Sequence, residues 1–555
     1  MTASCRATLV PLLAAACMAA SSVHAADPRA VVSSSGVQGG LVVHLDCGEA
    51  NDTSALRLND RYLVQGLESD PAKVQAARKA LHSAGLYGPV SVYRYDGTTL
   101  PYADNSVNLI VGDRTRVPAA ETMRALAPLG VAVIDGKTTR KPWPDEIDNW
   151  SHFLHGTDNN AVAADTVVAP PRSLQWISKP KWGRSHEETP SLSTTVTAKG
   201  RVFSIVDEAP LASIRHRGIW RLVARDAFNG ILLWKKPIPV WIDHLREFRT
   251  GPVFLPRTLV AVGDEVYVTL GLGQPLTALD AATGRERRVY AGTEYTEEIL
   301  CDNGVLYLAA GTSEVDRVGS GLHMRDEPKP SGFRRVMAVD AASGKVLWRN
   351  ELKEALLPLS LAVRDGRVCY QTASGVVCVD ASSGKKRWHT PRGTPERRMA
   401  FSAPTVVMTD DVVLVADRIP DKKQPASKGQ LKWGIAGFHN VGGFNYRSKS
   451  RIAAYDLSSG KELWSAPCEE TYDSPVDVFV RGDTVWVGAN LKSAEFNSYD
   501  VKTGKPLTPL KWTGARVGMG HHRCYRNKAT TKYLLTGRSG IEMVDFEKGW
   551  LNNNS

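Results

Sequence analysis

Cysteine is scarce in this chain of 555 residues, and its spacing excludes two common kinds of cofactor site. The eight cysteines include no Cys-x-x-Cys pair, no haem-attachment motif and no adjacent pair. Closely spaced thiolates are what structural zinc sites and covalent haem attachment require. The sequence therefore predicts neither zinc nor haem, and no metal ligand can be assigned from spacing.

Long apolar stretches and runs of one charge are also missing after the first 25 residues. No later stretch approaches the roughly 20 apolar residues of a membrane helix, so no transmembrane segment is expected. The net charge of +11 is spread along the chain without a basic run, which argues against nucleic-acid binding. A diffuse positive excess is compatible with an anionic polysaccharide or an anionic membrane surface. Another exported protein is the alternative partner.

The first residues have the pattern of a secretory signal peptide. An almost wholly apolar segment, Ala7–Ala20, is followed by a small-x-small cleavage site that ends at Ala25. We therefore expect residues 1–25 to be removed, residues 26–40 to form a linker, and the mature protein to be periplasmic or secreted. Acylation at Cys17 is an alternative to this cleavage.

Two of the remaining cysteines, Cys369 and Cys378, flank a tight hairpin symmetrically. An oxidising compartment permits a disulfide between them. Two small buried thiols inside a sheet would fit the same pattern, and the sequence leaves both readings open.

A short repeat places Asp four residues before Gly, and Gly four residues before Trp. Complete copies stand at Asp226–Gly230–Trp234, Asp340–Gly344–Trp348, Asp380–Gly384–Trp388 and Asp456–Gly460–Trp464; Asp280–Gly284, Asp500–Gly504 and Asp545–Gly549 lack the Trp. We expect the Asp to accept backbone N–H groups in a hairpin turn and the Gly to adopt a positive φ. The Trp is expected on the outermost strand, packed against the neighbouring unit. A period of about 40–45 residues predicts four-stranded propeller blades.

Seven groups of inner strands precede these turns. They begin near Val202, Val266, Val305, Val368, Val412, Val485 and Tyr533. Outer strands follow six groups, and residues 173–177 are expected to supply the seventh. Because the chain stops soon after a turn, we expect a fragment of a longer protein. The predicted fold is mainly β, with a seven- or eight-bladed propeller over residues 171–555 that is incomplete at its C-terminus.

This repeat resembles the tryptophan-docking repeat of pyrroloquinoline-quinone (PQQ) propellers, a family that includes quinoprotein alcohol dehydrogenases and outer-membrane assembly lipoproteins. The resemblance implies the fold strongly and the chemistry weakly, since the repeat residues maintain blade packing. Enzymes of the family hold PQQ with calcium, and often have a disulfide between adjacent cysteines. This chain has no such pair, so the cofactor remains unknown.

Residues 41–136 alternate strands and helices, which predicts a small α/β, Rossmann-like domain with a parallel sheet. Their order resembles a class I S-adenosylmethionine methyltransferase. On that resemblance, Asp46 and Gly48 stand at the glycine-rich loop, Glu68 at the ribose-binding acid and Asp96 at the adenine-contacting acid. Only Gly48 remains of the glycines that let the backbone approach the cofactor. We therefore expect a degenerate domain kept for packing or recognition, with a live methyltransferase as an alternative.

A linker at 137–190 and late loops carry the side chains best suited to chemistry. The candidate catalytic residues are His152, His155, His186, Arg516, His521, His522 and Tyr525. A neutral His or Tyr abstracts a proton and Arg neutralises a uronate carboxylate in polysaccharide lysis. The whole arrangement resembles large secreted propeller proteins of planctomycetes and related bacteria.

Three functions fit these observations: a ligand-binding or scaffold propeller, a PQQ-dependent dehydrogenase, and a carbohydrate-active enzyme acting as a lyase or hydrolase. The first needs no complete active site and is the reading we adopt, with catalysis unproven. S-adenosylmethionine-dependent methyl transfer is a further alternative.

Overall fold

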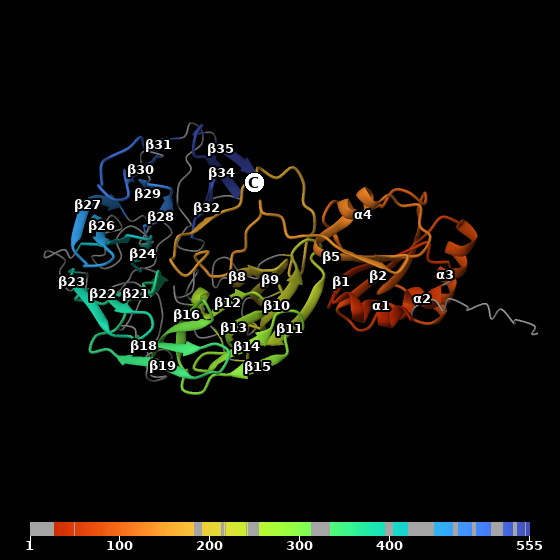
Figure 1. Ribbon diagram of the computed structural model, residues 1–555, viewed down its shortest axis with the longest axis horizontal. Helices are drawn as coiled ribbons and strands as arrows, with labels where there is room; N and C mark the ends of the chain where they lie inside the picture. The colour runs from red at the N-terminus through yellow and green to blue at the C-terminus, as the bar shows by residue number, and fades with distance from the viewer. Residues whose placement is uncertain are drawn as a thin grey trace, which may run out of the picture.

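The protein is described by a computed structural model in which a small α/β domain lies beside a ring of β-sheets (Figure 1). The described residues are 27–48, 50–181, 191–212, 216, 218–239, 241, 255–311, 333–393, 403–419, 449–469, 476–490, 495–511, 526–536, 541–549 and 551–554. No helix among them is long and apolar enough to cross a membrane.

The α/β domain is a six-stranded sheet flanked by helices. Its elements are α1 (Pro28–Ser35), β1 (Gly40–Leu45), α2 (Ala50–Ala55), β2 (Tyr62–Glu68), α3 (Pro71–Ser83), β3 (Val90–Arg94), β4 (Val107–Gly112), α4 (Ala119–Ala125), β5 (Leu126–Ile134) and β6 (Lys137–Arg140). The strand order is β3-β2-β1-β4-β5-β6, and all neighbours are parallel except β5 and β6. The α/β class is confirmed, and the sheet extends beyond residues 41–136 to include β6.

Local sequence explains why these elements form. Asp70 caps α3 by accepting the amide of Ala72, and Pro71 occupies the first turn. Along β1, Val42 contributes to one apolar core while Leu41, Val43 and Leu45 contribute to the other. This alternation buries both faces of the sheet, as a parallel sheet covered by helices requires.

The second domain consists of seven four-stranded antiparallel blades, so the propeller prediction is confirmed. Blades 1 to 4 are β8 (Leu192–Ala198), β9 (Arg201–Asp207), β10 (Trp220–Asp226) and β11 (Leu232–Pro237); β12 (Leu259–Val262), β13 (Glu265–Thr269), β14 (Leu276–Asp280) and β15 (Glu286–Val289); β16 (Thr296–Asp302), β17 (Val305–Gly311), β18 (Phe333–Asp340) and β19 (Val346–Glu351); β20 (Ala362–Arg364), β21 (Arg367–Gln371), β22 (Gly375–Asp380) and β23 (Lys386–Pro391).

Blades 5 to 7 are β24 (Thr405–Met408), β25 (Val412–Arg418), β26 (Lys449–Asp456) and β27 (Glu462–Glu469); β28 (Val478–Arg481), β29 (Thr484–Asn490), β30 (Glu495–Asp500) and β31 (Leu510–Lys511); β32 (Lys528–Thr530), β33 (Tyr533–Thr536), β34 (Ile541–Asp545) and β35 (Leu551–Asn554). Each predicted inner-strand group starts at the second strand of its blade. One innermost strand of three to seven residues precedes each group, and the sequence pattern missed it.

The turn and tryptophan roles are also confirmed. The turn carboxylate of Asp280 accepts the amides of Ala282 and Thr283, and Gly284 has φ +68°. Trp234 lies on β11, donates its indole N–H to Ala281 O at 2.9 Å, and covers Gly284 so closely that a side chain there would enter the ring. The same indole-to-carbonyl bond joins Trp348 to Ala381, Trp388 to Leu457 and Trp464 to Val501.

Blade 2 lacks this tryptophan and replaces it with two side chains. Arg288 stands at the Trp position and donates to Ser343 O at 2.9 Å. Tyr290, two residues later, donates its hydroxyl to Ala341 O at 2.7 Å, which is the carbonyl that an indole would otherwise reach. The docking contact is therefore preserved although the repeat residue is lost.

The prediction for residues 173–177 was wrong in one respect. The outermost strand of blade 7 is β35, and residues 173–177 are not in a strand. Trp176 nevertheless docks on blade 1 in the repeat manner, donating to Ala227 O at 3.0 Å and covering Gly230. The docking contact on blade 1 therefore comes from a segment outside the sheet of blade 7.

Apolar clusters join each blade from 1 to 7 to the next one in chain order. A cavity of about 260 Å³ lies between blade 1 and the segment around Trp176. Val202, Ser204 and Val206 of β9 face this cavity, and Trp176 and Pro180 border it.

Cys369 and Cys378 are direct partners across β21 and β22. Both are fully buried and carry free thiols, and burial raises the pKa of Cys369 well above its usual value. The structure therefore shows the buried-thiol arrangement.

Candidate functional site at the propeller hub

The linker before the propeller runs through the centre of the ring. Seven of its residues bond to the innermost strands of blades 1 to 7 in order. Trp150 O accepts from Thr197 N, Ser151 O from Ala261 N, His152 Nε2 from Cys301 N, Thr157 O from Val363 N, Asp158 O from Met408 N, Asn160 Oδ1 from Val480 N and Ala161 O from Ala529 N, at 2.8–3.1 Å. We call residues 149–163 the hub plug.

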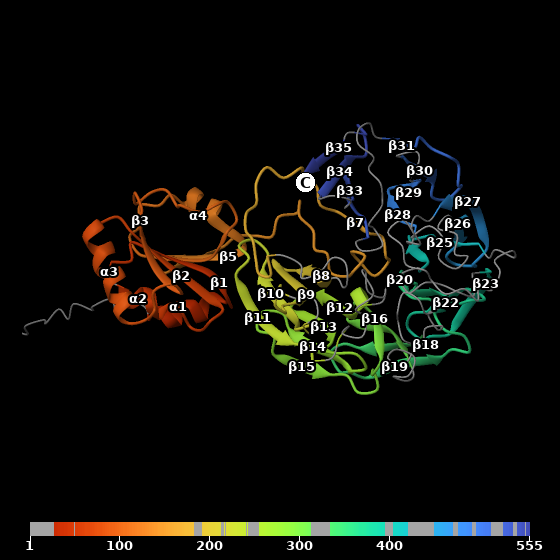
Figure 2. The same ribbon diagram turned by 180° about the vertical axis from the view of Figure 1, so that it is seen from behind.

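The hub plug ends in a strand of its own. β7 (Val162–Ala163) pairs in parallel with β32, which makes blade 7 five-stranded; Figure 2 labels β7 inside the ring of blades. The innermost strand of a blade has an unpaired edge whose backbone groups need partners. The plug supplies one such partner to every blade.

His152 and His155, both predicted as catalytic, lie in the hub plug. Nε2 of His152 accepts the Cys301 amide, so Nδ1 carries the proton and bonds Ser151 Oγ at 2.8 Å. The side chain is 3% exposed, and burial lowers the pKa of His152 to about 3. His155 Nε2 bonds Asp148 Oδ2 at 2.7 Å, and its ring meets Trp150 edge-on. Both imidazoles thus hold the plug together, and their catalytic roles stay predictions.

A ring of buried polar residues marks the beginning of the innermost strands. Each blade contributes at least one such residue within or just before that strand, and we take one from each, all at most 3% exposed: Thr194, Arg257, Glu298, Ser360, Thr405, Asp477 and Asn527. Because the strands are equivalent in the repeat, these residues gather at one end of the hub. We call this set the polar ring.

Arg257 connects the polar ring to the hub plug. It belongs to the 3-10 turn η2 (Leu255–Thr258), and its Nη2 donates to Asn159 Oδ1 at 2.8 Å and to Leu359 O and Leu361 O at 3.3 Å. Nε and Nη1 are buried and have no hydrogen-bond partner among the described residues. Burial lowers the pKa of Arg257.

Glu298 is the nearest carboxylate. Its Oε1 accepts Leu359 N at 2.5 Å, whereas Oε2 lies 4.0 Å from Arg257 Nη2 and has no hydrogen-bond partner in the described part of the chain. Burial raises the pKa of Glu298. This buried pair is therefore incompletely bonded on both sides.

Arg526 supplies a second guanidinium to the hub. Its Nε donates to Asp477 Oδ1 at 2.9 Å and its Nη2 to Thr405 Oγ1 at 3.2 Å. Nη1 is buried with no partner among the described residues. Burial is the main cause that lowers the pKa of Arg257, and the positive charge of Arg526 lowers it further, whereas the negative charge of Glu298 raises it. The two guanidinium groups therefore repel each other.

The other predicted catalytic residues fall outside the described residues. They are His186, Arg516, His521, His522 and Tyr525. Arg526 and Asn527, which follow them directly in the chain, lie in the hub. Asn159 belongs to the polar linker that the sequence pattern picked out, whereas no pattern singled out Arg257 or Glu298; an acid near the start of an otherwise apolar strand was the available signal for Glu298.

The four predicted cofactor residues lie at the carboxyl ends of β1, β2 and β3, where the three carboxylates accept hydrogen bonds from other groups of the protein. Glu68 is 5% exposed and accepts the amides of Gly48, Ser69 and Asp70 at 2.8–2.9 Å. Asp46 accepts the hydroxyl of Tyr95 at 2.7 Å.

Asp96 is exposed and accepts the amides of Thr98 and Thr99, which lower its pKa. Cys47 follows Asp46, and burial raises its pKa to about 11. A ribose-binding acid needs free acceptor oxygens, and both oxygens of Glu68 accept backbone amides, Oε1 from Ser69 and Asp70 and Oε2 from Gly48. The residues present do not fit S-adenosylmethionine.

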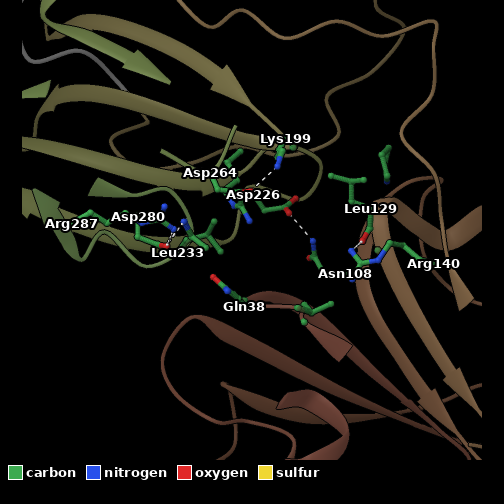
Figure 3. Close-up of a pocket in the computed structure, with 18 residues that line it drawn as sticks. Gln38, Asn108, Leu129, Arg140, Lys199, Asp226, Leu233, Asp264, Asp280 and Arg287 are labelled. Carbon is green, nitrogen blue, oxygen red and sulfur yellow. Dashed lines mark hydrogen bonds and ion pairs between the residues drawn. The ribbon is translucent and has the colours of Figure 1, made fainter. Parts of the chain in front are cut away.

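A polar cavity of about 510 Å³ lies where the two domains meet (Figure 3). Asn108 of β4 crosses this boundary: Nδ2 donates to Asp226 Oδ2 at 2.7 Å, and Oδ1 accepts from Asn229 Nδ2 at 2.8 Å. A side chain at Gly40, which has φ +102°, would collide with the Asn108 amide. Burial raises the pKa of Asp226.

Charged groups on the propeller side of the cavity are paired with one another. Lys199 contacts Asp264 at 2.6 Å, and Arg287 contacts Asp280 at 2.5 Å. This boundary involves the amino ends of the α/β strands, so Asp46, Gly48, Glu68 and Asp96 lie at the edge away from the propeller.

Comparisons with known proteins agree with the propeller. Residues 329–436 match the family model described as outer membrane protein assembly factor BamB. A putative dehydrogenase XoxF of Paracoccus denitrificans is 27% identical over 271 residues, covering 42% of this chain and 40% of that protein. A lanthanide-dependent methanol dehydrogenase of Methylorubrum extorquens is 25% identical over 189 residues, covering 31% and 27%. This chain thus spans well under half the length of these relatives.

Solved structures show only distant likeness. BamB of Moraxella catarrhalis has a TM-score of 0.35 at 12% identity, with 64% of this chain and 79% of that chain covered. Quinohemoprotein alcohol dehydrogenase ADHIIG of Pseudomonas putida has 0.37 at 14%, covering 66% and 64%. A putative S-adenosylmethionine-dependent methyltransferase of Methanococcus maripaludis has 0.18 at 19%, covering 20% and 54%. The chain is therefore a seven-bladed β-propeller preceded by an α/β domain, and part of its sequence is similar to a BamB-type propeller model and to two dehydrogenases.

Among the described residues, no group of three His, Cys, Asp or Glu side chains could hold a metal ion.

Proposed function

We propose that this protein is an exported propeller that binds a ligand at the polar-ring end of its hub. The observation that carries this proposal is the hub plug, which bonds to all seven blades near the far ends of their innermost strands. A ligand that enters from the polar-ring end meets the plug as a floor. Asn159 reaches from that floor to Arg257.

The satisfied groups of the plug support a rigid binding platform. His152 and Ser151 complete a bonded chain that ends on His155 O. Binding sites of high affinity need side chains held in place before the ligand arrives. Export rests on the apolar segment and cleavage site within residues 1–25, and the α/β domain serves packing or recognition.

A direct test is binding of the mature chain to anionic polysaccharides. Alginate and polygalacturonate, compared with neutral dextran in affinity electrophoresis, probe the predicted anionic partner. Selective retardation by the anionic polymers at physiological salt supports it, and equal mobility in all three gels contradicts it. Appearance of unsaturated uronate absorbance would add lysis, in which case His522, Tyr525 and Arg516 become the first residues to replace.

A second candidate is a quinoprotein dehydrogenase, which the names of the two sequence relatives favour. The mature protein would be incubated with PQQ and either calcium or lanthanum, desalted, and examined by absorbance and metal analysis. Retention of one quinone and one metal ion per chain supports this function. A colourless, metal-free protein under both conditions contradicts it.

A further inference from the structure

We propose that the hub contains an oxyanion-binding site formed by Arg257 and Arg526. The proposal rests on the hub-binding function above and names the class of ligand: a carboxylate or phosphate group. Three guanidinium nitrogens carry it: Nε and Nη1 of Arg257 and Nη1 of Arg526, all buried and without hydrogen-bond partners among the described residues.

The unpaired guanidinium nitrogens are energetically costly in the folded protein. A buried donor without a partner is destabilising by roughly 1–3 kcal/mol, and more when it is charged. Arg257 is 1% exposed, so bulk water does not compensate it. A guanidinium kept in such a place needs acceptors that the described protein atoms do not provide.

Both guanidinium groups are held in place by hydrogen bonds to the protein. Asn159 and two carbonyls occupy Nη2 of Arg257, while Asp477 and Thr405 occupy Nε and Nη2 of Arg526. These contacts fix both planes and leave the remaining N–H groups as donors. Fixed guanidinium groups suit carboxylate and phosphate oxygens better than a flexible ammonium does.

The two guanidinium groups differ in their counter-charge. Asp477 balances Arg526, and the nearest carboxylate to Arg257 is Glu298 at 4.0 Å, too long for a hydrogen bond. Burial favours the neutral form of Glu298 by raising its pKa, which leaves Arg257 without a full counter-charge. A bound oxyanion supplies both the missing charge and the missing acceptors.

The test is calorimetric titration of the mature chain with sodium phosphate, sodium galacturonate and sodium citrate, at constant ionic strength in chloride. Saturable binding of at least one anion to the wild type is expected, and the three probes separate a phosphate site from a carboxylate site. Arg257→Gln and Arg526→Gln should each raise the dissociation constant at least ten-fold. Arg257→Lys, which keeps the charge and loses the fixed donors, should also weaken it.

Arg335→Gln is the matched control, because Arg335 pairs with Glu351 on the two outer strands of blade 3, away from the hub plug and the polar ring. It should leave anion affinity within two-fold. If an Arg257 variant fails to fold, as judged by circular dichroism, Arg526→Gln and the wild-type titrations still decide.

Absence of saturable anion binding in the wild type overturns the site. So does equal affinity in the wild type and in both arginine variants. Polysaccharide or quinone binding that survives either result would leave the proposed hub function standing without this oxyanion site.

Discussion

Two regions of this protein bury carboxylates next to backbone, and they do so in opposite ways. At the carboxyl edge of the α/β sheet, Glu68 accepts two amides from its own loop and one from the loop after β1. In the hub, Glu298 leaves one oxygen without a partner and Arg257 leaves two nitrogens. Complete bonding identifies a group that maintains the fold, whereas buried groups with missing partners indicate a site that something else completes.

The largest effect is expected from the link between plug and polar ring. Asn159→Leu removes the acceptor of Arg257 and a donor to Leu361 O, which leaves a buried charge less well compensated. We expect a loss of about 3–5 kcal/mol in the free energy of unfolding, measured by urea denaturation. Asn51→Leu, at an exposed position of α2, should change it by less than about 0.5 kcal/mol. Equal effects of the two changes would contradict the role of Asn159.

Glu68→Ala tests the opposite case. Loss of the acceptor for three amides is expected to destabilise the α/β domain by about 2–4 kcal/mol. Hydrogen exchange should accelerate at Gly48, Ser69 and Asp70 while the blade strands keep their protection. The control Asp60→Ala removes only an exposed ion pair with Arg57 and should stay within about 0.5 kcal/mol. Unchanged exchange in Glu68→Ala would remove the structural role.

The pH dependence of stability separates the buried histidine from its neighbours. His152 has an ordinary pKa of 6.5 when unfolded and about 3 when folded, so only the unfolded chain takes up its proton between these values. Its contribution is complete above pH 6.5, and stability falls by about 1.4 kcal/mol per pH unit as the pH drops toward 3.

His152→Gln keeps an acceptor for the Cys301 amide and cannot titrate. Between pH 7 and pH 4 the denaturation midpoint of the wild type should therefore fall more steeply with decreasing pH than that of the variant. Parallel curves would show that His152 is not buried as a neutral imidazole.

The smallest effect on stability is expected at the contact between the α/β domain and the propeller. Asn108→Ala removes bonds to Asp226 and Asn229 and should cost about 1–2 kcal/mol, with the two domains unfolding in better separated calorimetric transitions. A cycle with Asp226→Ala should be non-additive, since the two side chains are in contact. Additive effects would show that the 2.7 Å bond carries no coupling.

Much of the fold could be predicted because it rests on local rules. The Asp–Gly turns, the positive φ of Gly284 and the docking of Trp234 follow from residues a few positions apart. The sequence pattern was misleading at two points. The outermost strand of blade 7 is β35, which directly follows β34 in the chain, and not the distant residues 173–177. The innermost strands were not recognised, although they range from three residues in β20 to seven in β8 and β16.

The candidate site was less predictable. Histidines attracted attention as titratable groups, yet the position of His152 depends on an amide 149 residues away. Arg257 follows a proline in a stretch without any recognisable motif. In the folded chain Asn159, Leu359 and Leu361 bond only its Nη2, and this leaves Nε and Nη1 buried without a partner among the described residues.

The sequence by itself determined the seven repeats, the turn chemistry and the α/β order, because hydrophobic period and turn residues act over a few neighbouring positions. Only the tertiary structure decided that the linker enters the hub and bonds to every blade, and that the Glu68 carboxylate is bonded by amides of two loops. Those outcomes depend on which backbone edges remain unpaired once the sheets have formed, and burial then fixes which polar groups are satisfied and which still lack a partner.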